Sequence, residues 1–278
     1  MRSKPLVLSA LSASVAAFTA FGIAPAQAGA SGHTPHSRPV RGASSTPSPL
    51  IDHGGKILTG SKTYAIWWGP TSQFPSDARS GMEQLLGGFG GSSYLAVANQ
   101  YLRGSAASSV FSRSLLDSSA PPAHSPSTAT IANEVARVLS ANGINPDPTA
   151  IYFVYTSNFP HANFCAWHSA GAIGAATVQI AYMPNAAGVA GCDPGDLYSA
   201  NTYSEGTRSL ADSTAHEFME ATTDPVPVSG WADKNGQEIG DKCNFVYSGP
   251  VKLANKSVWQ LQEEWSNAAG GCVQTAST

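Results

Sequence analysis

The chain has 278 residues, of which 42% are hydrophobic and only 12% are charged, and its formal net charge at pH 7 is −3. The charged fraction is about half the value usual for soluble domains, and the few Lys and Arg residues form no basic stripe. Neutralising phosphates requires clustered cations, so the composition argues against a nucleic-acid-binding protein.

The first 28 residues predict a secretory signal peptide. Arg2 and Lys4 form a basic start, residues 6–23 form an apolar stretch, and Ala26-Gln27-Ala28 is a small-x-small cleavage site. Cleavage after Ala28 removes two cations and no acids, which changes the net charge from −3 to −5. No later segment approaches the roughly 18 apolar residues that a membrane span needs. We therefore expect a secreted, extracellular, monomeric protein without membrane contact after processing.

Residues 29–49 are rich in Ser, Pro and Gly and predict a flexible leader. Residues 50–278 are enough for one sizeable core and predict a single domain. An even number of cysteines in an exported chain favours disulfides. Of the three possible pairings we favour Cys165–Cys192 and Cys243–Cys272, because each closes a loop of similar, moderate length. Each bridge would contribute on the order of 3 kcal/mol. A cysteine-ligated zinc is disfavoured because no Cys-x-x-Cys pair is present.

The first half of the ordered region reads as alternating strands and helices. Two β-rich runs, 56–58 and 63–68, flank a turn signal and predict a hairpin. Apolar residues at helical spacing predict two short helices within 76–102, joined by glycines. Segment 105–125 is expected to be an extended strand or a loop. A third helix is predicted over 128–142, where a glycine follows as a stop signal.

The second half contains the segments that we expect to form the centre of the sheet. Residues 150–155 are a nearly continuous apolar run, typical of a strand buried on both faces. Residues 176–182 predict another strand, 209–222 predict a helix, and 257–262 alternate as a half-exposed strand does. The chain is therefore expected to be an α+β protein, with helices packed on a mixed sheet and two disulfides.

Within the helix predicted over 209–222, the sequence Ala-His-Glu-Phe-Met-Glu predicts a metal site. His216 and Glu220 are spaced i, i+4, so both side chains leave one face of the helix about one turn apart. A mixed nitrogen and oxygen ligand set suits Zn²⁺. Glu217 points about 100° round the helix, toward a substrate side, where a general base that activates water would lie. The pattern is one residue away from the H-E-x-x-H of zinc peptidases.

A third ligand must come from another segment, and the glycine-flanked acidic segment 236–243 is the best source. Its two glycines allow close approach of the backbone, and a disulfide through Cys243 would anchor it. Asp241 is the first choice and Glu238 the second. A turn aspartate that bonds its own backbone is an equally good interpretation of Asp241. Asp224 and Asp233 are further candidates, although Asp224 precedes a proline and also fits a helix-end turn.

His168 follows the predicted central strand and lies close to a cysteine and a tryptophan. It is a candidate to line the same cleft, as a substrate ligand or a transition-state stabiliser. A packed histidine bonded to a nearby carbonyl is the commoner alternative. A Ser-His-Asp hydrolase is disfavoured, because no Gly-x-Ser-x-Gly elbow is present.

Several short motifs, taken in order, resemble the phosphate-induced protein 1 family of EXORDIUM-like secreted proteins. The likeness covers roughly residues 53–273 and rests on Tyr155-Thr156-Ser157, Phe164-Cys165, His168, Ala215-His216-Glu217, Glu220, Thr223-Asp224-Pro225, the segment 238–243, the segment 262–267 and Cys272. The resemblance implies an extracellular protein of the cell-wall type. It also implies that the helix motif and the segment 238–243 belong to one site.

Two functions are compatible with these residues. The first is a secreted zinc-dependent hydrolase, in particular a peptidase, on a zincin-like scaffold. In it His216, Glu220 and Asp241 hold Zn²⁺, Glu217 activates water, and His168 steadies the oxyanion. The second is a non-catalytic extracellular protein that binds a cell-wall polymer or a partner and uses the same residues as a structural metal or hydrogen-bond cluster. An additional anionic ligand makes a metal less electrophilic, which favours weaker catalysis.

Overall fold

The computed structural model describes residues 48–160 and 162–278. The signal peptide and almost all of the leader, predicted over 1–28 and 29–49, lie outside the described residues. Among the described residues, no helix is long and apolar enough to cross a membrane.

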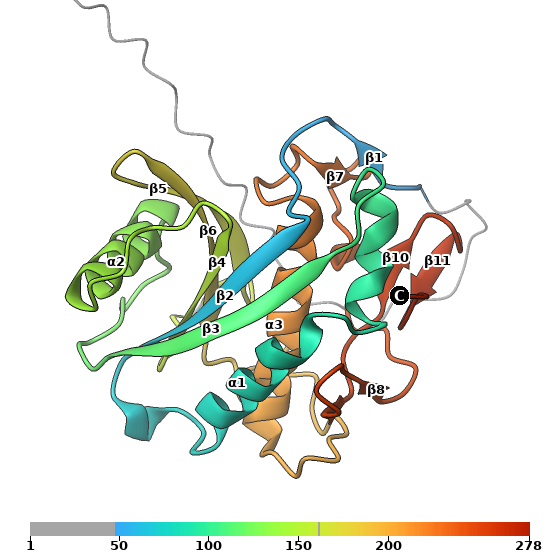
Figure 1. The fold of residues 1–278 in the computed structure, drawn as a ribbon. Coiled ribbons are helices and arrows are strands. Elements are labelled where there is room, and N and C mark those ends of the chain that lie inside the picture. The colour runs from blue at the N-terminus through green and yellow to red at the C-terminus, as the bar shows by residue number, and fades with distance from the viewer. Residues whose placement is uncertain (1–47, 161) are drawn as a thin grey trace, which may run out of the picture.

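A five-stranded sheet in the order β3-β2-β4-β6-β5 forms the centre of the structure (Figure 1). Four neighbouring strands run parallel, and β5 is antiparallel to β6 at one edge. The strands are β2 (Gly60–Trp68), β3 (Ser108–Asp117), β4 (Ala150–Thr156), β5 (Trp167–Ile173) and β6 (Ala176–Pro184). The expected α+β fold with a mixed sheet is confirmed.

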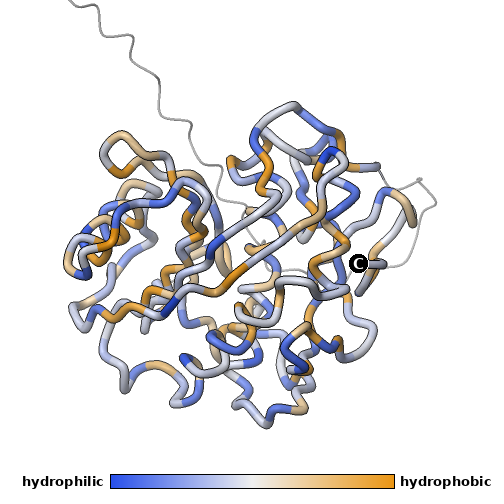
Figure 2. The backbone as a smooth tube through the Cα atoms, viewed as in Figure 1, coloured by the Kyte–Doolittle hydropathy of each residue, from blue (hydrophilic) through white to orange (hydrophobic). Residues whose placement is uncertain are grey.

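Helices cover both faces of this sheet (Figure 1). The helix α2 (Thr128–Ala141) packs on one face, and α1 (Ala78–Phe89) and α3 (Glu205–Thr223) lie on the other. Alternate residues of β4 enter the two cores: Phe153 faces α3, whereas Val154 faces α2. All seven residues of β4 are buried, which confirms the predicted central strand. Figure 2 shows hydrophobic residues recurring along the strands and helices of this core.

The predicted helices before β4 are confirmed with small shifts. The first helical pattern divides into α1 and a 3-10 helix, η2 (Leu95–Tyr101), with Gly90 and Gly91 between them. The helix α2 begins after Ser127, whose hydroxyl accepts a hydrogen bond from the backbone of Thr130, an arrangement that stabilises a helix by about 1 kcal/mol.

The predicted hairpin is wrong. Residues 56–58 form no strand, and β2 is a single strand that pairs in parallel with β3 and β4. Parallel neighbours need a long crossover rather than a tight turn, and α1 with η2 supplies the crossover from β2 to β3. The β-rich composition of 56–58 indicated an extended segment but could not indicate its partner.

Strand prediction also missed β5 and most of the C-terminal region. The half-exposed strand expected over 257–262 is reduced to β9 (Val258–Trp259), which pairs with β8 (Val251–Lys252). Leu261 and Gln262 continue it as buried irregular backbone. A second small hairpin, β10 (Glu264–Ser266) with β11 (Gly271–Val273), follows. A third pair joins β1 (Ile51–Asp52) to β7 (Trp231–Ala232). Runs this short carry almost no periodicity.

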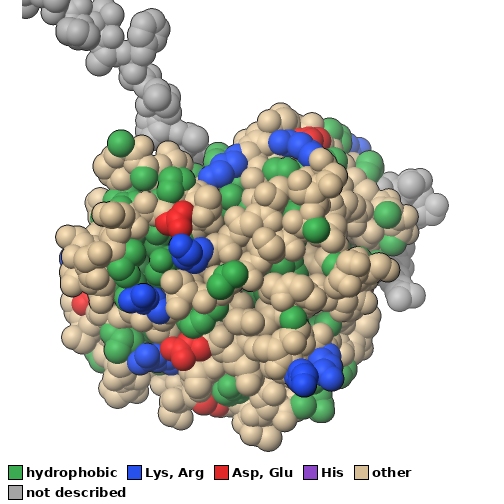
Figure 3. Space-filling view, viewed as in Figure 1, with side chains coloured by type: hydrophobic (Ala, Val, Ile, Leu, Met, Phe, Trp, Pro, Cys, Tyr) green, Lys and Arg blue, Asp and Glu red, His purple; other side chains and the backbone are tan. Residues whose placement is uncertain are grey.

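Both favoured disulfides are confirmed. Cys165–Cys192 closes a separation of 27 residues, and Cys243–Cys272 one of 29. All four cysteines are therefore oxidised, which leaves no cysteine for metal ligation. The face seen in Figure 3 is largely uncharged and carries only scattered Lys, Arg, Asp and Glu side chains, in agreement with the low charged fraction.

Candidate metal centre

The helix α3 carries the motif and buries it. It begins at Glu205, four residues earlier than predicted, because Asp77 accepts hydrogen bonds from Ser204 and Thr207 and fixes the first turn. The expected i, i+4 geometry holds: Nε2 of His216 lies 3.1 Å from Oε1 of Glu220. The side chains of both residues are at most 2% exposed.

The segment 236–243 brings Asp241 to this pair, as predicted. The backbone N–H of Asp241 donates to Oε1 of Glu220 at 3.0 Å, and Oδ1 of Asp241 lies 3.8 Å from Nε2 of His216. Gly240 allows this approach: a Cβ atom at this position would lie 2.9 Å from Nδ1 of His216. The disulfide between Cys243 and Cys272 ties the end of the segment to the C-terminal hairpin.

The Nδ1 atom of His216 is held by Gln262. Gln262 was not assigned to the site from the sequence. The Gln262 amide donates to the Gly240 carbonyl at 3.1 Å, so its Oε1 faces Nδ1 of His216, also at 3.1 Å. An amide oxygen only accepts, so Nδ1 carries a proton and Nε2 is the nitrogen that faces the carboxylates. Gln262 lies 46 residues away in sequence from His216, and no local pattern relates the two.

His168 joins the same cluster from β5. It pairs with Ala181 in the antiparallel register, and Ala181 belongs to the core on the α3 face. Its Nδ1 lies 3.1 Å from Oε2 of Glu217 and 3.5 Å from Oε2 of Glu220. Its Nε2 lies 2.9 Å from the main-chain oxygen of Asp224. His168 therefore lies beside the predicted site and also makes the carbonyl contact of the commoner alternative.

Glu217 does not face an open substrate side. Its side chain is 1% exposed and is directed at His168. Almost every residue of the second half of α3 is buried, because the sheet covers one side of the helix and the C-terminal segments cover another. In this structure Glu217 is therefore enclosed beside His168, and its predicted role as a general base stays a prediction.

Among the residues that the structure describes, two groups of three side chains lie close enough to hold a metal ion. One is His216, Glu220 and Asp241, and the other is His168, Glu217 and Glu220; in each group the ligand atoms lie within 4.8 Å of one another. Glu220 is common to both groups. The ligand set predicted from the sequence is thus assembled, and the structure adds a neighbouring set.

Two of the three remaining ligand candidates, Asp224 and Asp233, have other roles. The Asp224 carboxylate accepts backbone hydrogen bonds from Val228, Ser229 and Gly230, which closes the turn after α3. Asp233 accepts the N–H groups of residues 235 and 237 in the same manner. Glu238, the second choice, lies at the cluster, with Oε1 3.5 Å from Nε2 of His168.

The electrostatics reflect an excess of buried carboxylates. Burial lowers the pKa of His216 and of His168, but the surrounding carboxylates outweigh burial and raise both pKa values well above the ordinary value. Burial also tends to raise the pKa of Glu220, which the two histidines nevertheless lower strongly. Burial, reinforced by the Glu220 charge, raises the pKa of Asp241 to about 7. Burial raises that of Glu238 well above its usual range. A bound cation would compete with protons for these oxygens.

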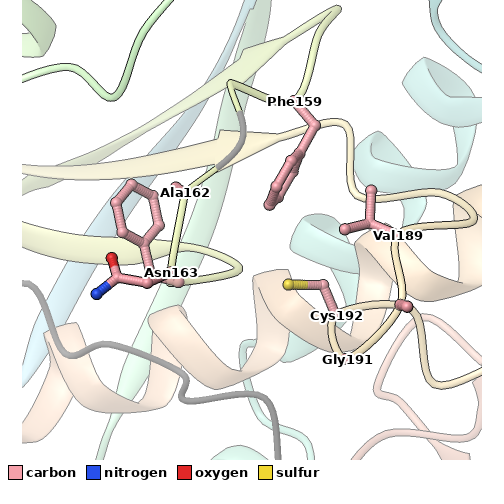
Figure 4. Close-up of a pocket in the computed structure, with 8 residues that line it drawn as sticks. Phe159, Ala162, Asn163, Val189, Gly191 and Cys192 are labelled. Atoms are coloured by element: carbon pink, nitrogen blue, oxygen red, sulfur yellow. The ribbon is translucent and has the colours of Figure 1, made fainter.

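The cluster has little access to solvent. A cavity of about 10 Å³ reaches His216 between Asp212 and Gln262, and this is about the smallest volume that holds one water molecule. A larger cavity of about 270 Å³ lies on the other side of Cys192, lined mainly by apolar residues such as Phe159 and Val189 (Figure 4). No residue of the metal-ligand groups lines this larger cavity.

Comparisons with known proteins identify no relative. No family model, no curated protein and no solved structure matches the chain. The resemblance to the phosphate-induced protein 1 family therefore stays an expectation from the quoted motifs, and the functional argument rests on the site itself.

Proposed function

We propose that the chain is a secreted, extracellular metal-binding protein in which His216, Glu220 and Asp241 hold Zn²⁺. The observation that carries the proposal is the buried contact of 3.1 Å between Nε2 of His216 and Oε1 of Glu220. The outward N–H of the same imidazole is directed at a fixed amide oxygen. Metal-ligating histidines are typically oriented by such an acceptor, and imidazole with carboxylates suits Zn²⁺.

The role that the geometry supports best is structural. The three ligands come from α3 and from the 3-10 helix η3 (Asp241–Cys243), so a cation between them would join the motif helix to the disulfide-tied C-terminal segments. Ligands that converge only in the folded chain make the free energy of metal binding part of the free energy of folding. His216 and Glu220 are buried and Asp241 is 19% exposed, which resembles a structural site more than an open catalytic one. In this proposal the outer surface contacts a cell-wall polymer or another extracellular partner, and the protein is monomeric.

Export is part of the proposal. The basic start, apolar stretch and small-x-small site of residues 1–28 favour it. Two disulfides are compatible with it, because disulfides persist in oxidising compartments. Membership of the EXORDIUM-like family belongs to the same proposal, and it rests on the quoted motifs alone.

A second candidate is a zinc-dependent hydrolase, in particular a peptidase, on a zincin-like scaffold. The observation that favours it is the water-sized cavity that ends at His216. Zn²⁺ in such a site would supply an acidified water. Glu217 would have to leave His168 to act as the general base, and His168 would then be available to donate to the oxyanion. Both steps need the site to open.

Metal analysis of the purified secreted chain tests the proposal. Plasma mass spectrometry should find zinc in the wild type, and His216→Ala and Asp241→Ala should lose it. His53→Ala is the matched control, because the His53 ring contacts the Ala232 carbonyl, outside the cluster. Folded wild-type protein without bound metal, even after incubation with Zn²⁺, would contradict the proposal.

Glu217→Gln separates the two candidates. A structural centre predicts intact folding without any peptidase activity in the wild type. A hydrolase predicts turnover by the wild type that Glu217→Gln abolishes, although the zinc bound at His216 is retained.

A further inference from the structure

Glu220 lies between the two histidines and directs one carboxylate oxygen at each. Its Oε1 is 3.1 Å from Nε2 of His216, and its Oε2 is 3.5 Å from Nδ1 of His168. This follows from the helix, because Glu220 is at i+4 from His216 and at i+3 from Glu217, and both spacings bring side chains together. A second histidine in this position could offer only one nitrogen to the centre. A carboxylate can contact two cations at once.

His168 is oriented as a ligand in the same way as His216. Its Nε2 lies 2.9 Å from the Asp224 carbonyl, which only accepts hydrogen bonds, so this nitrogen carries a proton. Its Nδ1 is then directed at Oε2 of Glu217 and at Oε2 of Glu220, at 3.1 and 3.5 Å. A histidine held through one nitrogen by a main-chain carbonyl, with the other facing carboxylates, matches the second-shell pattern of metal sites.

Two buried carboxylate oxygens without a hydrogen bond from the described residues are a second, independent observation that favours cation binding. Oε2 of Glu220 and Oε1 of Glu238 accept no hydrogen bond from any residue that the structure describes. The two side chains are 0% and 1% exposed. Leaving a buried acceptor without a donor costs about 1–3 kcal/mol, and more for a charged group.

The charge count favours two divalent cations over one. Four carboxylates, those of Glu217, Glu220, Glu238 and Asp241, each lie within 3.8 Å of a histidine nitrogen. Among the described residues, no Lys or Arg forms an ion pair with any of them. Buried charges need partners. With these carboxylates ionised and both histidines neutral, two divalent cations would balance the charge, whereas one cation would leave two negative charges for protons to balance.

We propose that the centre is dinuclear, with a second divalent transition-metal cation held by His168 Nδ1, Glu217 and Glu220, and with the Glu220 carboxylate bridging the two cations. The inference rests on the proposed site at His216, Glu220 and Asp241. It gives a physical reason for the departure from H-E-x-x-H, because the fourth residue after His216 must serve both cations. It also assigns Glu217 to ligation rather than to proton transfer.

Metal stoichiometry tests this arrangement. The purified secreted chain is stripped with a chelator, titrated with Zn²⁺, separated from unbound metal and analysed by plasma mass spectrometry. Two zinc ions per wild-type chain are expected. His168→Gln and Glu217→Gln should each reduce the count to one, and Glu220→Gln should reduce the affinity for both ions. The matched control His53→Gln should retain two.

The outcomes separate the two proposals. One zinc that is lost in His216→Gln but retained in His168→Gln would overturn the dinuclear centre and leave the proposed function intact. No zinc in folded wild-type chain would overturn both. Two zinc ions that survive His168→Gln and Glu217→Gln would place the second ion elsewhere and overturn the inference. Because a variant can fail to fold, wild-type protein loaded with Mn²⁺ gives a second readout by electron paramagnetic resonance. An exchange-coupled pair supports the bridge, and the spectrum of isolated ions contradicts it.

Discussion

The two faces of the central sheet are built in different ways. On the α2 face, an apolar helix stripe packs on apolar strand residues such as Ile66, Val154 and Ile180. On the α3 face, Phe218 and Met219 enter a similar apolar core, yet the same helix also buries His216, Glu217 and Glu220. Apolar burial is favourable wherever it occurs. Buried charge is favourable only where each group finds a partner.

The largest expected difference between the faces is their response to metal. With free Zn²⁺ at about 1,000 times the dissociation constant, a single site stabilises the folded chain by about 4 kcal/mol. Chelation should therefore lower the free energy of unfolding by a similar amount, as measured by urea denaturation at pH 7.5. His216→Ala should remove this zinc dependence. Equal stability with and without Zn²⁺ would mean that the cluster on the α3 face is satisfied without a cation.

A substitution that opens a cavity in the core on the α2 face should lower stability by an amount that does not depend on metal. Ile180 is fully buried there, and Ile→Ala substitutions at such positions cost about 2–5 kcal/mol. We expect Ile180→Ala to lower the free energy of unfolding by about 3 kcal/mol, by the same amount with Zn²⁺ and with chelator. A loss that depends on Zn²⁺ would show that the two faces are energetically linked through β6.

The difference between apolar and charged burial also explains which parts of the structure could be predicted from the sequence. The apolar periods of 128–142 and 150–155 predicted α2 and β4 almost to the residue, because their partners only have to be apolar. The i, i+4 spacing predicted the contact between His216 and Glu220 for an equally local reason. Asp241 was found because glycines and a cysteine mark a segment that approaches closely.

What the sequence could not supply are contacts over long separations. Gln262 contacts His216 across 46 residues, and Glu217 contacts His168 across 49. The parallel pairing of β2 with β3 has no signature in either strand, which is why a hairpin was expected. The enclosure of Glu217 depends on β5, a strand that was not predicted.

A buried carboxyl beside the centre should make the α3 face sensitive to pH. Burial raises the pKa of Asp212 to about 6, against the hydrogen bonds from Tyr247 and from the backbone of Gln262. The folded chain then keeps a proton that the unfolded chain loses from about pH 4 upward, so this group lowers stability as pH rises from about 4 to 6. Asp212→Asn removes that contribution, on the order of 2–3 kcal/mol at pH 7.5.

The measurement is the free energy of unfolding of wild type and Asp212→Asn in chelator from pH 3.5 to 7.5. The difference between the two should change in favour of the variant between pH 4 and 6 and be constant above pH 7. A difference that does not change with pH would show that Asp212 ionises normally in the folded chain. Ile180→Ala, on the other face, should give a constant difference over the whole range.

The smallest expected effect comes from one methyl group placed against the metal site. Gly240 has helical backbone angles, φ −76° and ψ −45°, which alanine adopts readily. A Cβ atom there would lie 2.9–3.1 Å from three atoms of the His216 ring, so Gly240→Ala must displace either the imidazole or the segment that carries Asp241. Displaced ligand support typically costs 10- to 100-fold in metal affinity, or about 1.4–2.8 kcal/mol. We expect a loss of Zn²⁺ affinity in this range, measured by titration against a competing chelator.

The control variant is Gly249→Ala, where a Cβ atom meets nothing within 4 Å, and it should bind Zn²⁺ as the wild type does. Unchanged affinity in Gly240→Ala would mean that His216 is not a ligand in this orientation, and the metal dependence of the α3 face would then have to arise from His168 and its neighbours.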